Sequence, residues 1–158
     1  MKAFIIYYTM GGRTKRAALA IGAELTNYEV SYFPVELKGR FIEKIKQFDR
    51  LEKGDFSELE PGLSNLDVAS YDLVLFGMPT YGSKPPGTFN EIIKRIANLS
   101  GKKVVIYTTA RFSGGKALED MKGQIEAKGA QIINQTTFRR LFYLGTRKAK
   151  KFGEEINL

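Results

Sequence analysis

Five stretches of the chain are rich in apolar, β-branched and aromatic residues and have the length of β-strands. They are residues 2–8, 28–35, 71–77, 102–109 and 130–138. Residues 4–8 and 73–76 show no polar alternation, which is typical of strands that are covered on both faces. Such strands favour a parallel sheet wrapped by helices.

Between these strands, apolar residues recur at spacings of three or four, the period of an amphipathic helix. They are Ala18, Ile21 and Leu25; Phe89, Ile92, Ile93, Ile96 and Leu99; and Leu118, Met121 and Ile125. Residues 146–158 predict a last helix, with Ala149, Phe152 and Ile156 on one face. Thr88 and Glu91 have the spacing of a capping box, which predicts the start of the helix that contains Phe89.

Residues 36–70 are less regular. Phe41, Ile42, Ile45 and Phe48 predict one amphipathic helix, while residues 54–67 predict an irregular surface connection. The whole alternation predicts one α/β domain over residues 1–158, with a doubly wound open sheet, because β-α-β crossovers are right-handed. We expect a five-stranded parallel sheet of order 2-1-3-4-5 with helices on both faces.

Composition limits the chemistry that the chain can do unaided. The 158 residues are 43% hydrophobic, which suits one substantial core, and they include no cysteine and no histidine. This excludes disulfides, thiolate metal sites and thiol nucleophiles, and it removes the usual general base, so we expect no metal and a reaction supplied by a bound group. No apolar run is long enough to cross a bilayer, and the N-terminus resembles a strand rather than a secretory signal, which predicts a cytoplasmic protein.

Three loops that follow strands are rich in hydroxyls and glycines: residues 9–14, 78–83 and 109–115. A glycine-rich turn that opens a helix directs backbone N–H groups at one point and suits an anion. Taken alone, the first loop could equally be a polar turn. In a sheet of order 2-1-3-4-5, however, all three loops lie side by side at the carboxyl edge, where ligands bind in such folds.

At these loops the chain resembles the flavodoxin family. Thr9-Met10-Gly11-Gly12-Arg13-Thr14 is similar to the family's phosphate loop, YDLVLFGMPTYG to its third strand and aromatic flavin loop, and KKVVIYTTARFSGG to its fourth strand and second flavin loop. The resemblance covers residues 2–157. It implies a flavodoxin-like sandwich that binds FMN non-covalently and carries electrons through the semiquinone and hydroquinone states of the flavin.

The resemblance also implies roles for single residues. Thr9, Gly12, Arg13 and Thr14 would hold the phosphate, within a loop completed by Met10 and Gly11. Gly11 stands where the family usually has a hydroxyl, and Arg13 could replace that hydrogen bond with a charge-assisted one. Lys15 and Arg16 are more simply interpreted as solvated residues.

The flavin ring would lie between the second and third loops. The residues implied there are Pro79, Thr80, Tyr81 and Gly82 from one loop and Thr108, Thr109, Ala110, Arg111, Phe112 and Gly115 from the other. Tyr81 would stack on the ring, unless it packs on the prolines of its own loop. Either Arg111 or Phe112 would cover the opposite side, a choice that the sequence leaves open.

Charge sets the chain apart from flavodoxins that shuttle electrons, which are generally acidic. The net charge is +8, and the residues after Pro79 include 15 basic and 6 acidic ones. Residues 139–151 hold six basic residues and no acidic one. A positive surface attracts an acidic redox protein, anionic membrane head groups or nucleic acid, although solvated helix faces are an equally simple explanation.

The charge of the loops predicts a redox property. Fully reduced flavin is an anion near neutral pH, so neighbouring cations favour its formation. The loops and their flanks carry Arg13, Lys84, Arg111 and Lys116 and no carboxylate. We therefore predict a hydroquinone potential less negative than that of an acidic flavodoxin.

Three functions fit these observations, in order of preference. The first is an FMN-binding electron-transfer protein with an acidic redox partner. The second is an FMN-dependent oxidoreductase of the NAD(P)H:quinone type, so whether the chain is an enzyme stays open. The third is a flavin-free module that binds a protein or nucleic acid through its basic C-terminal half.

Overall fold

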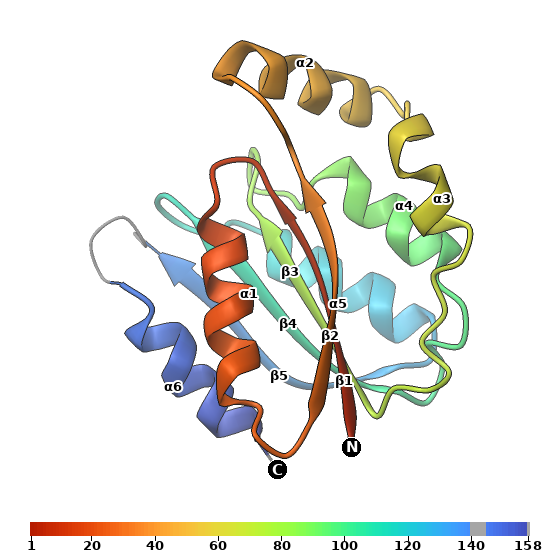
Figure 1. The fold of residues 1–158 in the computed structure, drawn as a ribbon, viewed down its shortest axis with the longest axis vertical. Coiled ribbons are helices and arrows are strands. Elements are labelled where there is room, and N and C mark those ends of the chain that lie inside the picture. The colour runs from red at the N-terminus through yellow and green to blue at the C-terminus, as the bar shows by residue number, and fades with distance from the viewer. Residues whose placement is uncertain (140–144, 158) are drawn as a thin grey trace.

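The predicted strands form one parallel sheet of order β2-β1-β3-β4-β5, which confirms the expected topology (Figure 1). The computed structural model describes residues 1–139 and 145–157. The strands are β1 Lys2–Thr9, β2 Glu29–Glu36, β3 Leu73–Pro79, β4 Lys103–Ala110 and β5 Gln131–Arg139. The helices are α1 Arg13–Glu24, α2 Phe41–Glu52, α3 Glu60–Leu63, α4 Gly87–Arg95, α5 Ala117–Ala127 and α6 Arg147–Ile156, with a 3-10 helix at Ser57–Leu59.

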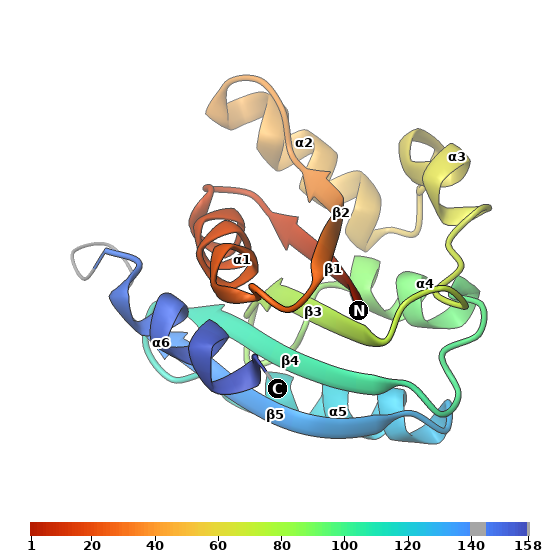
Figure 2. The same ribbon diagram turned by 60° about the horizontal axis from the view of Figure 1, so that its bottom comes forward.

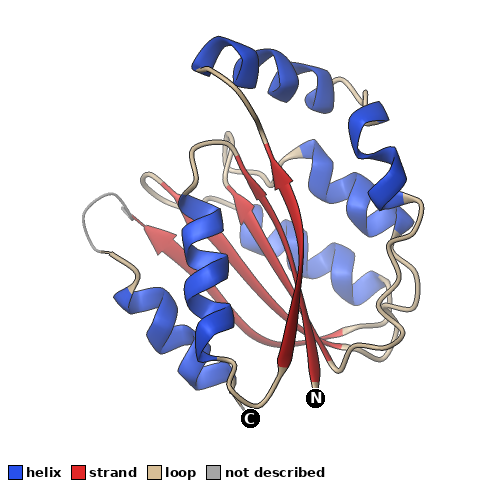
Figure 3. Cartoon of the chain, in the orientation of Figure 1, coloured by secondary structure: helices blue, strands red, loops and turns tan. Residues whose placement is uncertain are grey.

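Helices cover both faces of the sheet (Figures 1 and 2). Along β1, Ile5 and Tyr7 pack beneath α1 and α6, while Phe4, Ile6 and Tyr8 pack on the opposite face with α4 and α5. Both sets are apolar because both faces are buried, which explains the lack of polar alternation. Figure 3 shows α2 beyond the carboxyl end of β2, near the loops that follow β1 and β3.

Two local predictions were wrong. The first is the capping box, because α4 begins at Gly87 with Pro86 as its N-cap in an extended conformation. Thr88 therefore lies inside the first turn, where its hydroxyl is buried without a hydrogen-bond partner among the described residues. Glu91 instead pairs with Arg95. The N–H of Gly87, the first residue of α4, instead donates to Glu52 Oε1 of α2 at 2.8 Å.

The second is the irregular connection over residues 54–67. This segment contains the 3-10 helix and the single turn of α3. Leu63 is buried in the core beneath these turns, and Phe56 and Leu59 pack against the same core. The apolar residues are too few to show a helical period, which explains why the pattern did not reveal them.

Helix α6 lies against α1 through a glycine. A Cβ atom on Gly153 would lie 2.8 Å from the backbone oxygen of Ile21 in α1, so only glycine permits this approach. Ala149, Phe152 and Ile156 bury the predicted face of α6 on the same side of the sheet. The close packing keeps α6 in place beside α1, and both helices begin at the carboxyl edge of the sheet (Figure 1).

On the face of the sheet covered by α1 and α6, we expect the removal of a tyrosine hydroxyl to have opposite effects on stability at two positions. The Tyr107 hydroxyl is buried with no partner among the described residues, and burial raises the pKa of Tyr107 well above its ordinary value. Tyr107→Phe should therefore stabilise the fold by about 1–3 kcal/mol, the penalty of an unpaired buried polar group. The matched control is Tyr7→Phe, because the Tyr7 hydroxyl donates to Glu36 Oε1 at 2.8 Å.

Tyr7→Phe should lower the free energy of unfolding by about 0.5–1.5 kcal/mol, the usual net value of a hydrogen bond. Urea unfolding of both variants measures the two changes. A destabilising Tyr107→Phe change would show that the hydroxyl is paired in solution.

Candidate functional site

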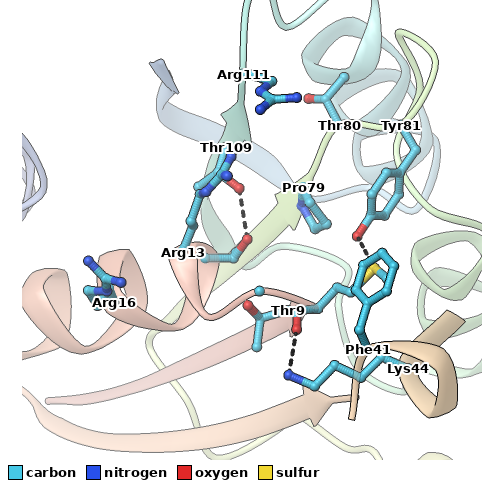
Figure 4. Close-up of a pocket in the computed structure, with 13 residues that line it drawn as sticks. Thr9, Arg13, Arg16, Phe41, Lys44, Pro79, Thr80, Tyr81, Thr109 and Arg111 are labelled. Atoms are coloured by element: carbon cyan, nitrogen blue, oxygen red, sulfur yellow. Dashed lines mark hydrogen bonds between the residues drawn. The ribbon is translucent and has the colours of Figure 1, made fainter. Parts of the chain in front are cut away.

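A cavity of about 600 Å³ opens at the carboxyl ends of β1, β3 and β4 (Figure 4). Its volume lies in the usual range for small-molecule sites, about 300–1,000 Å³. The residues that line it are Thr9, Met10, Gly11, Arg13, Thr14, Arg16, Phe41, Lys44, Pro79, Thr80, Tyr81, Thr109 and Arg111. The position is the one at which doubly wound sheets bind ligands.

The β1–α1 loop presents backbone to this cavity. Gly12 has a φ of +86° and is the N-cap of α1, a conformation that glycine adopts without strain. Its N–H donates to Thr9 Oγ1 at 2.9 Å, and its carbonyl accepts the first helical hydrogen bond from Arg16 at 3.0 Å. The earlier N–H groups of the turn, including those of Thr14 and Lys15, therefore have no acceptor within α1. A Cβ atom at Gly11 would meet nothing within 4 Å, so this turn is open to an anion.

Three hydroxyls add hydrogen-bonding capacity at the cavity. Thr14 Oγ1 and Thr109 Oγ1 lie 2.8 Å apart and join the first loop to the end of β4. Because each hydroxyl has one hydrogen, whichever accepts in this pair keeps its own hydrogen for another acceptor. Thr80 Oγ1 is buried without a partner among the described residues. A buried, unpaired hydroxyl in the cavity wall is a site that a polar ligand would satisfy.

The charged side chains that line the cavity are basic. Arg13 and Arg16 come from α1, Lys44 from α2 and Arg111 from the β4–α5 loop, and none of the described residues that line the cavity is acidic. Burial, together with the charges of Arg111 and Arg16, lowers the pKa of Arg13 from its ordinary value. Lys44 Nζ donates to the Met10 carbonyl at 3.2 Å. An anion at the end of α1 would relieve the repulsion between these arginines.

Tyr81 forms one wall of the cavity (Figure 4). Its ring packs edge-on against Phe48 of α2, with centroids 4.9 Å apart, and against Tyr8, at 6.3 Å. Its hydroxyl donates to Met10 Sδ at 3.9 Å, and burial raises its pKa to about 12, so the phenol is neutral at physiological pH. The ring thus lies between β1 and α2 in an orientation that the sequence did not predict.

Most of the predicted site residues meet in this cavity, and some lie elsewhere. Gly12, Gly82, Thr108, Ala110, Phe112 and Gly115 do not line it. Thr108 hydrogen-bonds to Thr137 of β5 at 2.9 Å, and Phe112 is 71% exposed. Gly115 lies against Ser83, so the second and third loops touch. Ligand contact by these six residues stays a prediction.

Sequence reasoning missed Phe41 and Lys44, which come from α2. Their spacing of three places them on one helix face, but only the tertiary position of α2 directs that face at the cavity. Arg16 was expected to be solvated, and it is exposed while also lining the cavity rim. Lys15 does not line the cavity and pairs with Glu36 at 2.9 Å. That ion pair, with the Tyr7 hydrogen bond, lowers the pKa of Glu36.

Within the described residues, no group of three or more acidic, histidine or cysteine side chains could hold a metal ion. None of the described helices is long and apolar enough to cross a membrane.

Comparison with known proteins places the fold. No protein-family model matches the sequence, and no curated protein matches it significantly. Among solved structures, a flavodoxin from the domain Archaea aligns with a TM-score of 0.62 and 16% identity, over 99% of this chain and 96% of that one. Two-electron reduced Megasphaera elsdenii flavodoxin aligns with a TM-score of 0.58 and 19% identity, over 96% of each chain. A flavone reductase aligns with a TM-score of 0.66 and 14% identity, over 99% of this chain and 62% of that one. The strand order and these alignments, which span nearly all of this chain, show that the chain has the flavodoxin-like fold.

Proposed function

We propose that the protein binds FMN in this cavity and acts as an electron-transfer protein. One observation carries the proposal: the open β1–α1 turn, the Thr14–Thr109 hydroxyl pair and the unpaired Thr80 hydroxyl meet in one cationic cavity. A phosphate suits the end of α1, because backbone N–H groups, a helix dipole and a guanidinium converge there. An apolar ring suits the part lined by Pro79, Tyr81 and Phe41.

The roles of the residues follow from their positions. Arg13 and the N–H groups of the first turn of α1 would bind the phosphate. Thr80 would donate to a polar ring or chain atom, and Tyr81 would form an aromatic wall. Arg111 would offer positive charge beside the ring. When bound, FMN supplies one-electron and two-electron redox chemistry.

Two further points support electron transfer. The Megasphaera elsdenii protein with a similar fold is a flavodoxin in its two-electron reduced state, so that protein takes up electrons on this fold. Phe41, at the rim of the cavity, is 73% exposed, so the rim is accessible to a partner. The positive charge of the rim favours an acidic redox protein as the partner. We also propose that the protein acts in the cytoplasm.

The test is electron delivery by the loaded protein. FMN-reconstituted protein, reduced with dithionite and freed of the excess, should reduce an acidic acceptor such as cytochrome b5 in a single turnover, and the apo-protein should not. The same preparation should show no steady consumption of NAD(P)H with a quinone. Rapid NAD(P)H-dependent turnover would instead identify an oxidoreductase, and loss of FMN on gel filtration would refute the proposal.

The positive charge of Arg111 should favour the reduced flavin. Arg111→Glu changes the local charge by two units. At about 10 Å from the reduced flavin, this change would weaken the binding of the flavin's negative charge by about 1–3 kcal/mol, for an effective dielectric of about 20–80. We therefore expect a more negative hydroquinone potential, measured by reductive titration against a reference dye. Arg111→Gln should give about half the shift. A potential that does not respond to either variant would place Arg111 away from the ring.

A further inference from the structure

The first turns of α1 and α6 carry basic residues and no acidic ones. Cations are unfavourable at this end of a helix because the helix dipole is positive there. The two turns are neighbours: a small cavity between the helices is lined by Arg13, Arg16 and Ala17 of α1 together with Gly145, Thr146 and Ala149. Neither dipole nor packing accounts for the charge of these turns.

These residues extend the positive rim of the main cavity along one side of the molecule. Arg13 and Arg16 line the main cavity as well as the small one. Beyond Thr146, a surface groove is lined by Arg147, Lys150, Lys151 and Glu154. We call Arg13, Arg16, Arg147, Lys150 and Lys151 the α1–α6 basic strip. It runs from the cavity rim over the outer side of α6.

Few acids offset this charge. Lys150 Nζ lies 4.0 Å from Glu24, and Glu154 lines the end of the groove farthest along α6. With the rest of the described chain, Arg147 and Lys151 form no ion pair. By contrast, α5 has Glu119 and Asp120 in its first turn. The positive charge is therefore concentrated on the α1–α6 side of the molecule and adjoins the cavity.

We propose that the α1–α6 basic strip is the docking surface for an acidic electron-transfer protein, which reaches the cavity across Arg13 and Arg16. The choice of a redox partner rests on the proposed function. Charge complementarity supplies the long-range attraction and the orientation. The exposed rings of Phe41 and Phe112, near the cavity, offer the apolar contacts that protein partners use and that a polyanion does not need.

The test compares two double charge reversals with the same change in net charge. Arg147→Glu with Lys151→Glu alters the strip, while Lys94→Glu with Lys122→Glu alters α4 and α5 on the opposite face of the sheet. The probe is a plant-type [2Fe–2S] ferredoxin, which is strongly acidic. Its affinity for the apo-protein is measured by calorimetry at low and at physiological ionic strength.

At physiological ionic strength, where a Debye length of about 8 Å confines each charge to its neighbourhood, the strip variant should raise the Kd at least about tenfold and the control variant less than about twofold. The thermal midpoint of the strip variant should change little, because Arg147→Glu complements the helix dipole while Lys151→Glu is repelled by Glu155 one turn away. Lost binding with retained stability therefore reports docking and not misfolding. The FMN affinity of the strip variant should also stay unchanged, so a failure of the FMN proposal would be seen separately.

Three outcomes would overturn the proposal. The first is equal weakening by both variants, which would mean that only net charge matters. The second is no binding of the ferredoxin at low ionic strength. The third is tighter binding of a short DNA duplex than of the ferredoxin, abolished in the strip variant, which would make the strip a nucleic-acid surface.

Discussion

Arg13→Ala should weaken the binding of FMN about 10-fold to 100-fold, the loss expected when a charge-assisted hydrogen bond to phosphate is removed. Riboflavin, which lacks the phosphate, should lose less than about twofold. The apo-protein should keep its stability, because the variant removes the repulsion of Arg13 with Arg111 and Arg16. Quenching of flavin fluorescence measures both affinities.

The neighbouring lysine provides the control. Lys15 lies in the same turn of α1 but pairs with Glu36 and does not line the cavity. Lys15→Ala changes the net charge by the same amount as Arg13→Ala. Because Lys15 does not line the cavity, Lys15→Ala should leave the FMN affinity within about twofold. Equal losses of FMN and riboflavin in Arg13→Ala would show that the phosphate binds elsewhere.

Phe76→Ala should lower the free energy of unfolding by about 3–5 kcal/mol. Phe76 lies on the central strand β3, is 0% exposed and packs edge-on against Phe89 of α4, with centroids 5.9 Å apart. Its removal leaves a cavity between the sheet and α4 that the surrounding strands cannot close. Guanidinium unfolding followed by circular dichroism measures the change.

An exposed phenylalanine supplies the comparison. Phe41 lies at the cavity rim, so Phe41→Ala should change stability by less than about 0.5 kcal/mol. It should instead weaken FMN and riboflavin alike, because the ring would contact the flavin and not the phosphate. If Phe76→Ala cost less than about 1 kcal/mol, the packing between β3 and α4 would differ from that described.

The sequence predicted the sheet well because strands depend on local patterns. The continuous apolar residues 4–8 and 73–76 indicate strands that are buried on both faces. The predicted strand bounds lie within two residues of the observed ones. The loops after β1, β3 and β4 then meet through the topology of the sheet. This is why Thr9, Thr14, Thr80 and Thr109 could be assigned to one site.

Other features depend on tertiary positions that no local pattern encodes. The helical period of α2 is evident, yet only its place beyond β2 brings Phe41 and Lys44 to the cavity. Thr108 and Thr109 are neighbours in sequence, but strand alternation sends Thr108 toward β5 and Thr109 toward the first loop. At α4, the first N–H donates to a side chain of α2, where Thr88 had suggested a cap.

The most direct test of the account is a fluorescence titration of the apo-protein with FMN, with riboflavin and a short DNA duplex as comparators. The account predicts tight binding of FMN, much weaker binding of riboflavin, and the largest loss of this difference in Arg13→Ala. No binding of FMN together with salt-sensitive binding of DNA would contradict it, and would mean that residues 7–14 form only a turn.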